Sequence, residues 1–414
     1  MTEGAGADLR ALIPAHFQDD ARPLGIAVSG GSDSMALLHL MVEWGRAPLR
    51  CVTVDHRLRP EAGDEAAQVA QVCAGLGIAH DTLVWDGWDG QGNLPAAARE
   101  ARYALMAGWA ARHGLAGLVL GHTRDDVAET LLMRLARRAG VEGLAAMQAR
   151  RAAHGTVLHR PLLAAGRGDL RAYLAQRGIQ WAEDPSNDDP RYRRTLARRA
   201  LAAFAPVGID APALADVAAH LAEASATLGH YAALEAEHIV RADQGDLLLD
   251  AAGFAALRPD IARRILGAAI GWIAGPGVRL RGPDVTRLMA AIAAGQGGTL
   301  AGCRITQCRG QIRLAREFAA VAGLRADLGE PWDGRWRLIG PPAPGAHIAA
   351  LGPEGRTLCP EWRESGLPAH SIDASPALWR GAALLAAPLA RYSSEYRAAP
   401  CRALSDFHAA LLSH

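Results

Sequence analysis

A run of small polar residues, SGGSDS, occupies positions 29–34, between a short apolar stretch and a segment with helical spacing. Consecutive glycines let a backbone turn sharply and direct its N–H groups at an anion. The positive end of the following helix would point at the same place. We therefore predict that this loop binds the phosphates of a nucleotide. The predicted contacts are Ser29, Gly30, Gly31, Ser32, Asp33 and Ser34.

Asp33 is the unusual member of this loop, because a carboxylate repels phosphate unless a cation lies between them. We predict that Asp33 holds Mg²⁺ against the phosphate oxygens. The alternative is a tight strand–helix turn in which Asp33 and Ser34 serve only as helix caps. A bare pair of glycines would favour that alternative, whereas the full strand–loop–helix context favours phosphate binding.

A second polar motif, GHTRDDVAET, spans residues 121–130. Asp126 and Glu129 are spaced i, i+3 and therefore share one face of a helix. Paired carboxylates suit the capture of an ammonium group, and the alternative is an acidic helix start that the helix dipole stabilises. His122 and Asp125 lie beside them and are candidates for contacts with a metal or an adenylate. Ligands on a single turn do not by themselves define a metal site.

Two other segments carry residues that suit a nucleotide. Asp55 and His56 close the second predicted strand, where an adenine or a ribose would lie, and a structural histidine is the alternative. Asn93, Arg99 and Arg102 open and line the third predicted helix. Arginines near a phosphate site would neutralise charge in a transition state. Ordinary surface arginines are the alternative.

The segment RYRRTLARR, residues 191–199, contains five arginines. As a helix it would present a basic stripe, the electrostatic pattern of a protein that follows a nucleic-acid backbone. The alternative is a solvated face in an arginine-rich chain. The predicted nucleic-acid contacts are Arg191, Arg193, Arg194 and Arg198. A separate RGD triplet at 167–169 is interpreted as a chance sequence at a helix start.

Strand-like and helix-like segments alternate along the first half of the chain. Strands are predicted within 23–29, 49–55, 81–85 and 117–122, and helices within 34–44, 62–76, 95–113 and 125–138. This alternation is typical of an α/β fold with a parallel sheet and helices on both faces. Ligands of such sheets bind at the carboxyl ends of the strands. The polar motifs all follow predicted strands, so we expect them to meet at one edge.

The alternation stops after about residue 205. A long helix is predicted at 211–241, two more near 258–274 and 283–295, and a strand pair at 299–316 with Gly310 at its turn. The Pro- and Gly-rich stretch 341–353 is predicted to be a loop, and short strands follow it. We expect three domains: a catalytic α/β domain at 1–205, a helical middle domain with a terminal strand pair at 206–320, and a small α+β domain at 321–414.

The amino-acid composition excludes some kinds of phosphate loop and of covalent catalysis. All 44 basic residues are arginine, which excludes a Walker-type loop and Schiff-base formation on a lysine of the chain. A net charge of +1 and 50% hydrophobic residues indicate a folded protein that is not polybasic. The six cysteines form no CxxC pair and are expected to be free thiols in a reducing cytoplasm. We expect neither a secretion signal nor a membrane span.

SGGSDS after a strand resembles the pyrophosphate loop (PP-loop) of the N-type ATP pyrophosphatases, which cleave ATP between the α- and β-phosphates and adenylylate a substrate oxygen. Further motifs narrow the resemblance. They are VDHRLRP at 54–60, NLPAAAREARYALM at 93–106, GHTRDDVAETLLMRLARRAG at 121–140, RPLL at 160–163 and WAEDPSNDDPRYRR at 181–194. In this order they closely resemble the tRNA(Ile)-lysidine synthetase family. PEWRESGLPAHS and PALWRGAALLAAPLARY are more weakly similar to its terminal domain.

The resemblance implies an adenine nucleotide alpha hydrolase-like PP-loop domain that uses ATP, Mg²⁺, free L-lysine and the isoleucine tRNA with a CAU anticodon. The C2 oxygen of the wobble cytidine is adenylylated and pyrophosphate leaves. The lysine ε-amine then attacks C2 and expels AMP. The product, lysidine, changes codon specificity from AUG to AUA. The terminal domain is expected to bind the tRNA.

The resemblance also implies residue roles. Lysine recognition falls on Asp126 and Glu129, and tRNA binding on the arginine segment. The implied catalytic residues are Asp33, Arg99, His122, Asp125 and Asp126. One position departs from the family pattern, because Thr195 stands where the family has Asn.

Two other functions stay open at this point. A related tRNA thiolase would be expected to carry cysteine pairs for sulfur or iron–sulfur chemistry. A tRNA-binding protein with a vestigial loop would bind tRNA without releasing AMP. A homodimer is also left open.

Overall fold

The computed structural model describes residues 8–57, 62–88, 94–183, 193–275, 278 and 280–412. The chain divides into two compact units, Met1–Glu223 and Ala224–His414. The three-domain division made from the sequence stays a prediction.

The first unit is built on a six-stranded sheet with the order β3-β2-β1-β4-β6-β5. Its strands are β1 (Leu24–Ala27), β2 (Leu49–Asp55), β3 (Ala79–Val84), β4 (Gly117–Leu120), β5 (Arg150–Ala153) and β6 (Thr156–His159). All neighbouring pairs are parallel except β5 with β6. The predicted parallel α/β sheet is therefore confirmed.

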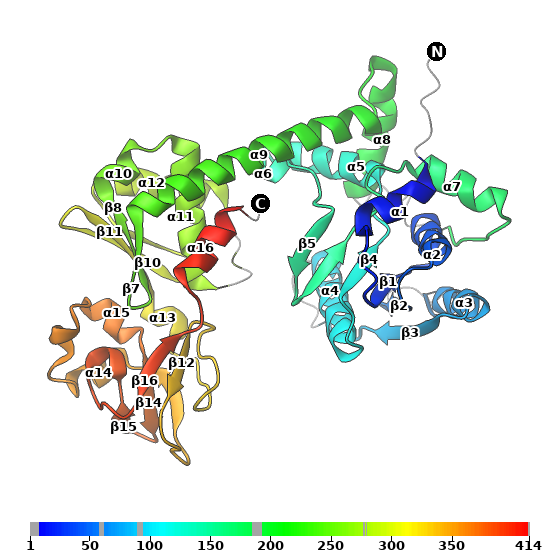
Figure 1. The fold of residues 1–414 in the computed structure, drawn as a ribbon. Helices are drawn as coiled ribbons and strands as arrows, with labels where there is room; N and C mark the ends of the chain where they lie inside the picture. Colours follow the sequence, from blue (N-terminus) through cyan, green and yellow to red (C-terminus); the bar gives the residue numbers. More distant parts are fainter. Residues whose placement is uncertain are drawn as a thin grey trace. The chain divides into compact units, whose positions relative to one another are not determined.

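Helices cover both faces of this sheet (Figure 1). The helices of the first unit are α1 (Leu9–Phe17), α2 (Ser32–Trp44), α3 (Ala62–Gly75), α4 (Leu94–Arg112), α5 (Arg124–Leu135), α6 (Val141–Leu144), α7 (Arg167–Gln176) and α8 (Arg193–Phe204), followed by the 3₁₀ turn η2 (Ala205–Val207). Because strand side chains alternate between faces, Ile26 of β1 enters the core with α2 and α7. Its neighbour Ala27 packs in the opposite core, which contains Trp109 of α4.

The β5–β6 hairpin was not predicted. Its two-residue turn, His154–Gly155, has φ angles of 53° and 77°. Positive φ at both positions is the backbone of a type I′ hairpin turn, for which Asn-Gly is the usual signal. The strand β5 is mostly exposed, so it lacks the apolar alternation that reveals a strand in sequence.

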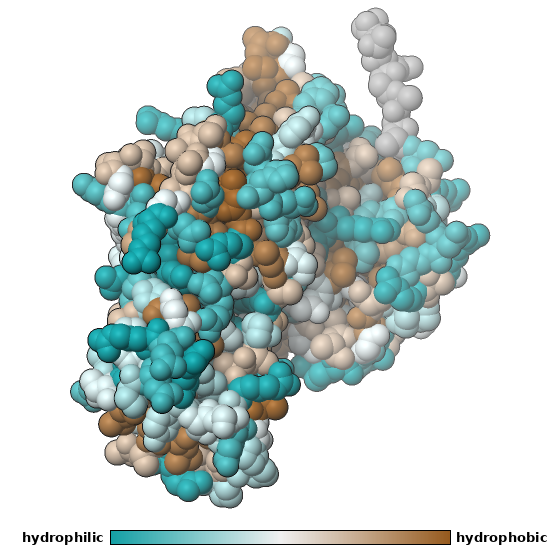
Figure 2. Space-filling view, turned by 60° about the vertical axis from the view of Figure 1, so that its left-hand side comes forward, coloured by the Kyte–Doolittle hydropathy of each residue, from teal (hydrophilic) through white to brown (hydrophobic). Residues whose placement is uncertain are grey.

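The long helix predicted at 211–241 is confirmed as α9 (Ala211–Ile239), which begins in the first unit and ends in the second. The turn that precedes it exposes apolar side chains, Phe204, Val207 and Ile209. Figure 2 shows brown, hydrophobic groups at the top of the view, where this turn lies. Within the described ranges no single helix has the length and hydropathy to cross a membrane; the bent pair of Arg193–Val207 with Ala211–Ile239 meets the criterion by length and composition only.

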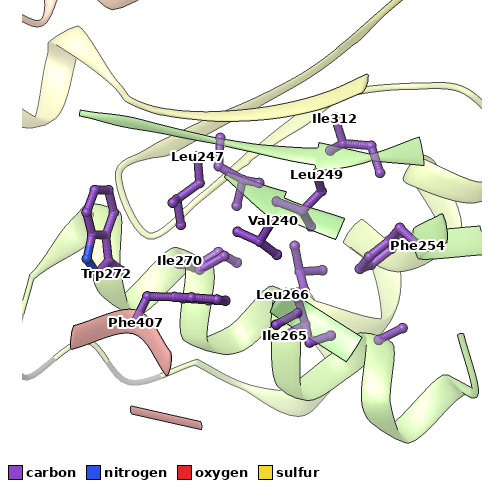
Figure 3. Close-up of a cluster of buried hydrophobic side chains, with 14 of the residues drawn as sticks. Val240, Leu247, Leu249, Phe254, Ile265, Leu266, Ile270, Trp272, Ile312 and Phe407 are labelled. Atoms are coloured by element: carbon purple, nitrogen blue, oxygen red, sulfur yellow. The ribbon is translucent and has the colours of Figure 1, made fainter. Parts of the chain in front are cut away.

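The second unit contains an antiparallel sheet of order β7-β8-β11-β10-β9. Its strands are β7 (Val240–Asp243), β8 (Asp246–Asp250), β9 (Gly298–Leu300), β10 (Cys303–Cys308) and β11 (Gln311–Arg316), and its helices are α10 (Ala251–Ala256), α11 (Pro259–Ala274) and α12 (Gly282–Ala293). The predicted strand pair with Gly310 at its turn is confirmed as β10–β11. The sheet packs on α11, where Leu247 and Leu249 face Ile270 (Figure 3).

The rest of the second unit is a group of short elements around two small sheets, β12-β16 and β13-β14-β15. They are α13 (Phe318–Val321), β12 (Trp336–Ile339), β13 (His347–Ala350), α14 (Gly352–Thr357), η3 (Trp362–Ser365), α15 (Ala369–Asp373), β14 (Pro376–Arg380), β15 (Ala383–Ala386), η4 (Pro388–Ala390), β16 (Arg397–Pro400) and α16 (Leu404–Leu412). The loop predicted at 341–353 was wrong in part, because β13 lies within it. Phe407 of α16 returns to the core beside Ile270 (Figure 3).

Candidate active site

The SGGSDS loop joins β1 to α2. Gly30 has φ 85°, a left-handed conformation that favours glycine, and Gly31 is the N-cap of α2. The hydroxyl of Ser34 donates to the carbonyl of Gly31 at 2.9 Å and accepts from the backbone N–H of Ser29 at 3.1 Å. The loop therefore holds its own shape at the positive end of a helix, which is a preformed place for an anion.

A cavity of about 850 Å³ opens beside this loop. Its walls include Ser32, Asp33, His56, Arg102, His122 and Arg167. The strand β1 lies between β2 and β4, so the cavity sits where the strand order changes direction, at the carboxyl ends of the strands. Its volume is in the range of small-molecule sites.

Three carboxylates from two helices meet at one guanidinium beside the cavity. Arg167, the first residue of α7, contacts Asp33 through Nε at 3.1 Å, Asp126 through Nη2 at 3.2 Å and Glu129 through Nη1 at 3.1 Å. Its backbone N–H donates to Asp125 at 2.7 Å. The phosphate loop and the acidic pair of Asp126 and Glu129 are thereby joined through a single side chain.

Two arginines of α8 complete this ion cluster. Arg194 contacts Glu129 at 2.7 Å and Asp126 at 3.0 Å, and Arg198 contacts Glu129 at 2.6 Å. The side chain of Glu129 is only 1% exposed. Three carboxylates thus face three guanidiniums, Asp33, Asp126 and Glu129 against Arg167, Arg194 and Arg198, so their formal charges cancel.

Asp126 has a second task. One of its oxygens, Oδ2, accepts from the backbone N–H of Thr123 at 2.8 Å and closes a capping box at the start of α5. Its other oxygen, Oδ1, faces the two arginines. The acidic helix start that the sequence offered as the alternative is therefore present at Asp126, whose Oδ1 is left to the arginines, whereas Glu129 is not part of the cap.

Burial and charge set the protonation of the cluster. Burial raises the pKa of the Asp33 carboxyl, against the opposing effect of Arg167. Burial by itself would lower the pKa of Arg167, but Asp33, Glu129 and Asp126 outweigh it and raise that pKa above its ordinary value. Arg167 is therefore a permanent cation.

A separate group of cations lies on α4. Arg99 donates to the hydroxyl of Tyr103 at 3.2 Å, and the guanidinium carbons of Arg99 and Arg102 lie 5.2 Å and 5.3 Å from the ring centroid. Burial opposes ionisation of the Tyr103 hydroxyl, but Arg99, Arg102 and Arg160 outweigh it and lower its pKa. The group has an excess of positive charge, which suits a phosphate.

Two histidines border the cavity in the neutral form. Burial, reinforced by Arg160 and Arg102, holds the pKa of His122 well below its ordinary value. Burial and Arg102 likewise lower the pKa of His56. The Nδ1 atoms of both rings are buried without a hydrogen-bond partner in the part of the chain that the structure describes. Both residues line the cavity.

Comparison with known proteins adds to this geometry. The PP-loop domain family matches residues 7–204. A tRNA(Ile)-lysidine synthase of Ruegeria pomeroyi is 49% identical over 418 residues, which is 100% of both chains. The chain belongs to the tRNA(Ile)-lysidine synthase family. It is accordingly an ATP-using, tRNA-modifying ligase with a lysidine-forming role, and the family resemblance seen in the sequence is confirmed.

More distant relatives carry the same name. The tRNA(Ile)-lysidine synthase of Bradyrhizobium diazoefficiens is 39% identical over 325 residues, covering 71% of this chain and 90% of the relative. That of Wolbachia pipientis wMel is 34% identical over 327 residues, covering 76% of each. Among solved structures, a U34-tRNA thiolase of Methanococcus maripaludis is similar with a TM-score of 0.45 and 14% identity, over 52% of this chain and 76% of that one.

The site of this tRNA(Ile)-lysidine synthase family member brings most of the predicted residues together. His56 and His122 line the cavity with the phosphate loop, and Asp126 and Glu129 lie on one face of α5. Asp55 instead accepts from the backbone N–H of Arg57 at 2.8 Å. Asn93 and Arg191 lie outside the described residues.

The arginine segment divides its side chains between two directions. Arg193 is exposed at the start of α8, whereas Arg194 and Arg198 point at the acidic pair. A helix places residues four apart on one face, so the inward pair is 194 and 198. Thr195, at the position that departs from the family pattern, is buried.

Arg167 was not among the predicted site residues, although the helix start at its RGD triplet is confirmed, since α7 begins there. Nothing in the local spacing pointed to it, since its partner Asp33 is 134 residues away in sequence. The sequence offered one indication of its position. Arg167 follows RPLL at a predicted helix start, and a side chain there can face the edge of the sheet that carries the loops.

Proposed function

We propose that the protein joins L-lysine to C2 of the wobble cytidine of the isoleucine tRNA with a CAU anticodon. In this reaction ATP first adenylylates the C2 oxygen and releases pyrophosphate, and the ε-amine of lysine then attacks C2 and expels AMP. The observation that carries the proposal is the contact network of Arg167, which joins the phosphate loop to a buried acidic pair. A nucleotide site and an ammonium site then share one centre.

The phosphates of ATP are assigned to the SGGSDS loop. The N–H groups at the start of α2 and the hydroxyls of Ser29 and Ser32 are donors of the kind that phosphate oxygens accept. Asp33 would hold Mg²⁺, which supplies neutralising charge at the phosphate oxygens. No group of three or more His, Cys, Asp or Glu suited to a metal occurs among the described residues. The fit is thus to a magnesium ion bound by one carboxylate together with phosphate oxygens.

Lysine is assigned to Asp126 and Glu129. Two carboxylate oxygens that are buried among cations provide strong, directional acceptors for an ammonium group. His122 and Arg99 keep their proposed catalytic roles. A neutral His122 accepts or donates a hydrogen bond at the reacting base without adding charge, and Arg99 stabilises negative charge on the transferred adenylate. Asp125 acts by holding the backbone of Arg167.

Transfer of labelled lysine tests this function. The purified protein is incubated with ATP, Mg²⁺, labelled lysine and a transcript of either the CAU-anticodon isoleucine tRNA or the elongator methionine tRNA. We expect stable label on the isoleucine tRNA alone. If AMP forms only when tRNA is present but no label appears on the tRNA, lysine is not the nucleophile. Bound tRNA with neither label nor AMP would instead favour a binding protein.

A further inference from the structure

The oxygens of the acidic pair are all engaged by protein donors. In Glu129, Oε1 accepts from Arg167 and Arg198, and Oε2 accepts from Arg194. In Asp126, Oδ1 accepts from Arg167 and Arg194, and Oδ2 is held by the cap of α5. A carboxylate oxygen has about two acceptor directions. Glu129 Oε2 accepts from Arg194 and keeps one open direction. An ammonium group can therefore make more than this one contact with the pair only when one of these guanidiniums moves away.

Arg167 is the guanidinium that links the acidic pair to the phosphate loop. It contacts Asp126 at 3.2 Å and Glu129 at 3.1 Å. The phosphate loop is already within reach of Arg167, because its Nε contacts Asp33 of that loop at 3.1 Å.

Bound nucleotide would supply the force for that movement. A triphosphate brings several negative charges to the SGGSDS loop, and guanidinium groups match phosphate oxygens in a two-point geometry. When Arg167 leaves the pair, one positive charge is lost there, and the ammonium group of lysine replaces it. The two carboxylates then again face three cations, so the exchange conserves charge at the buried site.

We propose that Arg167 is a shared counter-ion that couples the two substrate sites: nucleotide phosphates draw it toward the loop and so free Asp126 and Glu129 for lysine. This inference rests on the assignment of lysine to that pair in the proposed function. Coupling of two binding sites is reciprocal, so ATP strengthens lysine binding and lysine strengthens ATP binding by the same factor. Arg167 is a positioning residue whose effect appears in affinities before any chemistry occurs.

Calorimetric titration with lysine tests the coupling directly. The dissociation constant for lysine is measured without nucleotide and with a saturating α,β-methylene analogue of ATP and Mg²⁺, in the wild-type protein and in Arg167→Gln. In the wild type we expect the analogue to tighten lysine binding about tenfold, which is a typical coupling. In Arg167→Gln we expect tighter lysine binding without nucleotide. We also expect the ratio of the lysine dissociation constants measured without and with the analogue to be close to one.

Arg171→Gln is the matched control. Arg171 lies one turn further along α7 and lines the same cavity. Its guanidinium contacts Ser32 at 3.5 Å and Glu183 at 3.1 Å, not the acidic pair, among the described residues. Its loss is expected to weaken binding of the analogue while the lysine ratio stays at the wild-type value. If Arg167→Gln melts far below the wild type, Arg167→Lys replaces it; a single ammonium reaches fewer carboxylates, so a reduced ratio is expected.

The outcomes separate the inference from the proposed function. An undiminished ratio in the folded Arg167 variants, with lysine still bound, would overturn the coupling and leave the lysine assignment standing. A wild-type protein that binds the analogue yet never binds lysine would overturn the lysine assignment and the coupling with it.

Discussion

The backbone of Gly121 lies so close to the phosphate loop that a Cβ at this position would sit 3.0 Å from the carbonyl oxygen of Asp33. The end of β4 and the start of α2 therefore touch through backbone alone. This contact sets the distance between the nucleotide loop and the GHTRDD segment that carries the acidic pair. A side chain at residue 121 would push the two apart.

Gly121→Ala tests that contact. We expect the loop to shift by a few tenths of an ångström, the KM for ATP to rise about tenfold and the free energy of unfolding to fall by about 1–2 kcal/mol. The measurements are steady-state kinetics and urea unfolding. Gly75→Ala, in α3 where an added Cβ meets nothing within 4 Å, is the control and is expected to leave both values near wild type. Equal effects in the two variants would contradict the account.

Asp33→Ala should abolish tRNA-dependent AMP formation. Loss of the proposed magnesium ligand removes charge stabilisation at the phosphates, and we expect a rate at least about 10²-fold lower. Arg167 keeps its contacts with Asp126 and Glu129, so the fold is expected to survive, and thermal melting checks it. Near-normal AMP formation in a folded variant would remove Asp33 from the proposed metal site.

Arg193→Ala should weaken tRNA binding and leave ATP binding unchanged. Arg193 is the exposed arginine at the start of α8, beside the acidic cluster. Loss of one phosphate contact is expected to raise the KM for tRNA several-fold. It should also reduce the slope of log binding constant against log salt concentration by about one. Arg22→Ala is the control: Arg22 is 69% exposed and precedes β1, at the end of the strand opposite the loop. Matching losses in both variants would indicate a non-specific charge effect.

A partly buried histidine pair predicts a loss of stability in acid. His16 Nε2 and His159 Nδ1 lie 3.1 Å apart, and burial lowers the pKa of each ring to about 4. Arg150 near both rings, and Arg22 near His159, act in the same direction, whereas Asp20 opposes them at His159. The folded state binds fewer protons than the unfolded state, so this contribution is complete above about pH 6.5 and is lost as the pH falls toward 4.

Urea unfolding across this pH range measures the effect. The double variant His16→Gln/His159→Gln cannot titrate there, so its free energy of unfolding is expected to fall less than that of the wild type. The expected difference is on the order of 2 kcal/mol. Parallel pH profiles for the two proteins would show that the pair does not contribute.

The sequence predicted the elements whose pattern is local, and it predicted that Asp33, His56 and His122, which follow strands, lie at one edge of the sheet. Ile26 and Ala27 pack in two different cores, as neighbouring residues of a buried parallel strand do. Such strands are recognised in a sequence as short apolar runs. The β7–β8 hairpin was missed because its turn, Gln244–Gly245, lacks the usual Asn or Asp, although both residues have positive φ.

The arrangement of charges could not be predicted in the same way. Five arginines in a row of nine residues indicate a basic helix, but only the packing of α8 against α5 turns Arg194 and Arg198 inward to Glu129. Arg167 reaches Asp33 across 134 residues. Such contacts depend on tertiary structure, and no helical or strand period encodes them.

The most direct test of the central claim, that the acidic pair serves lysine and the loop serves ATP, is the effect of Glu129→Gln on each substrate. Glu129 suits this test because Asp126 also caps α5. The account predicts a KM for lysine at least about tenfold higher, with the KM for ATP and the tRNA-dependent release of pyrophosphate close to wild type. An unchanged KM for lysine in a folded Glu129→Gln protein would contradict the account.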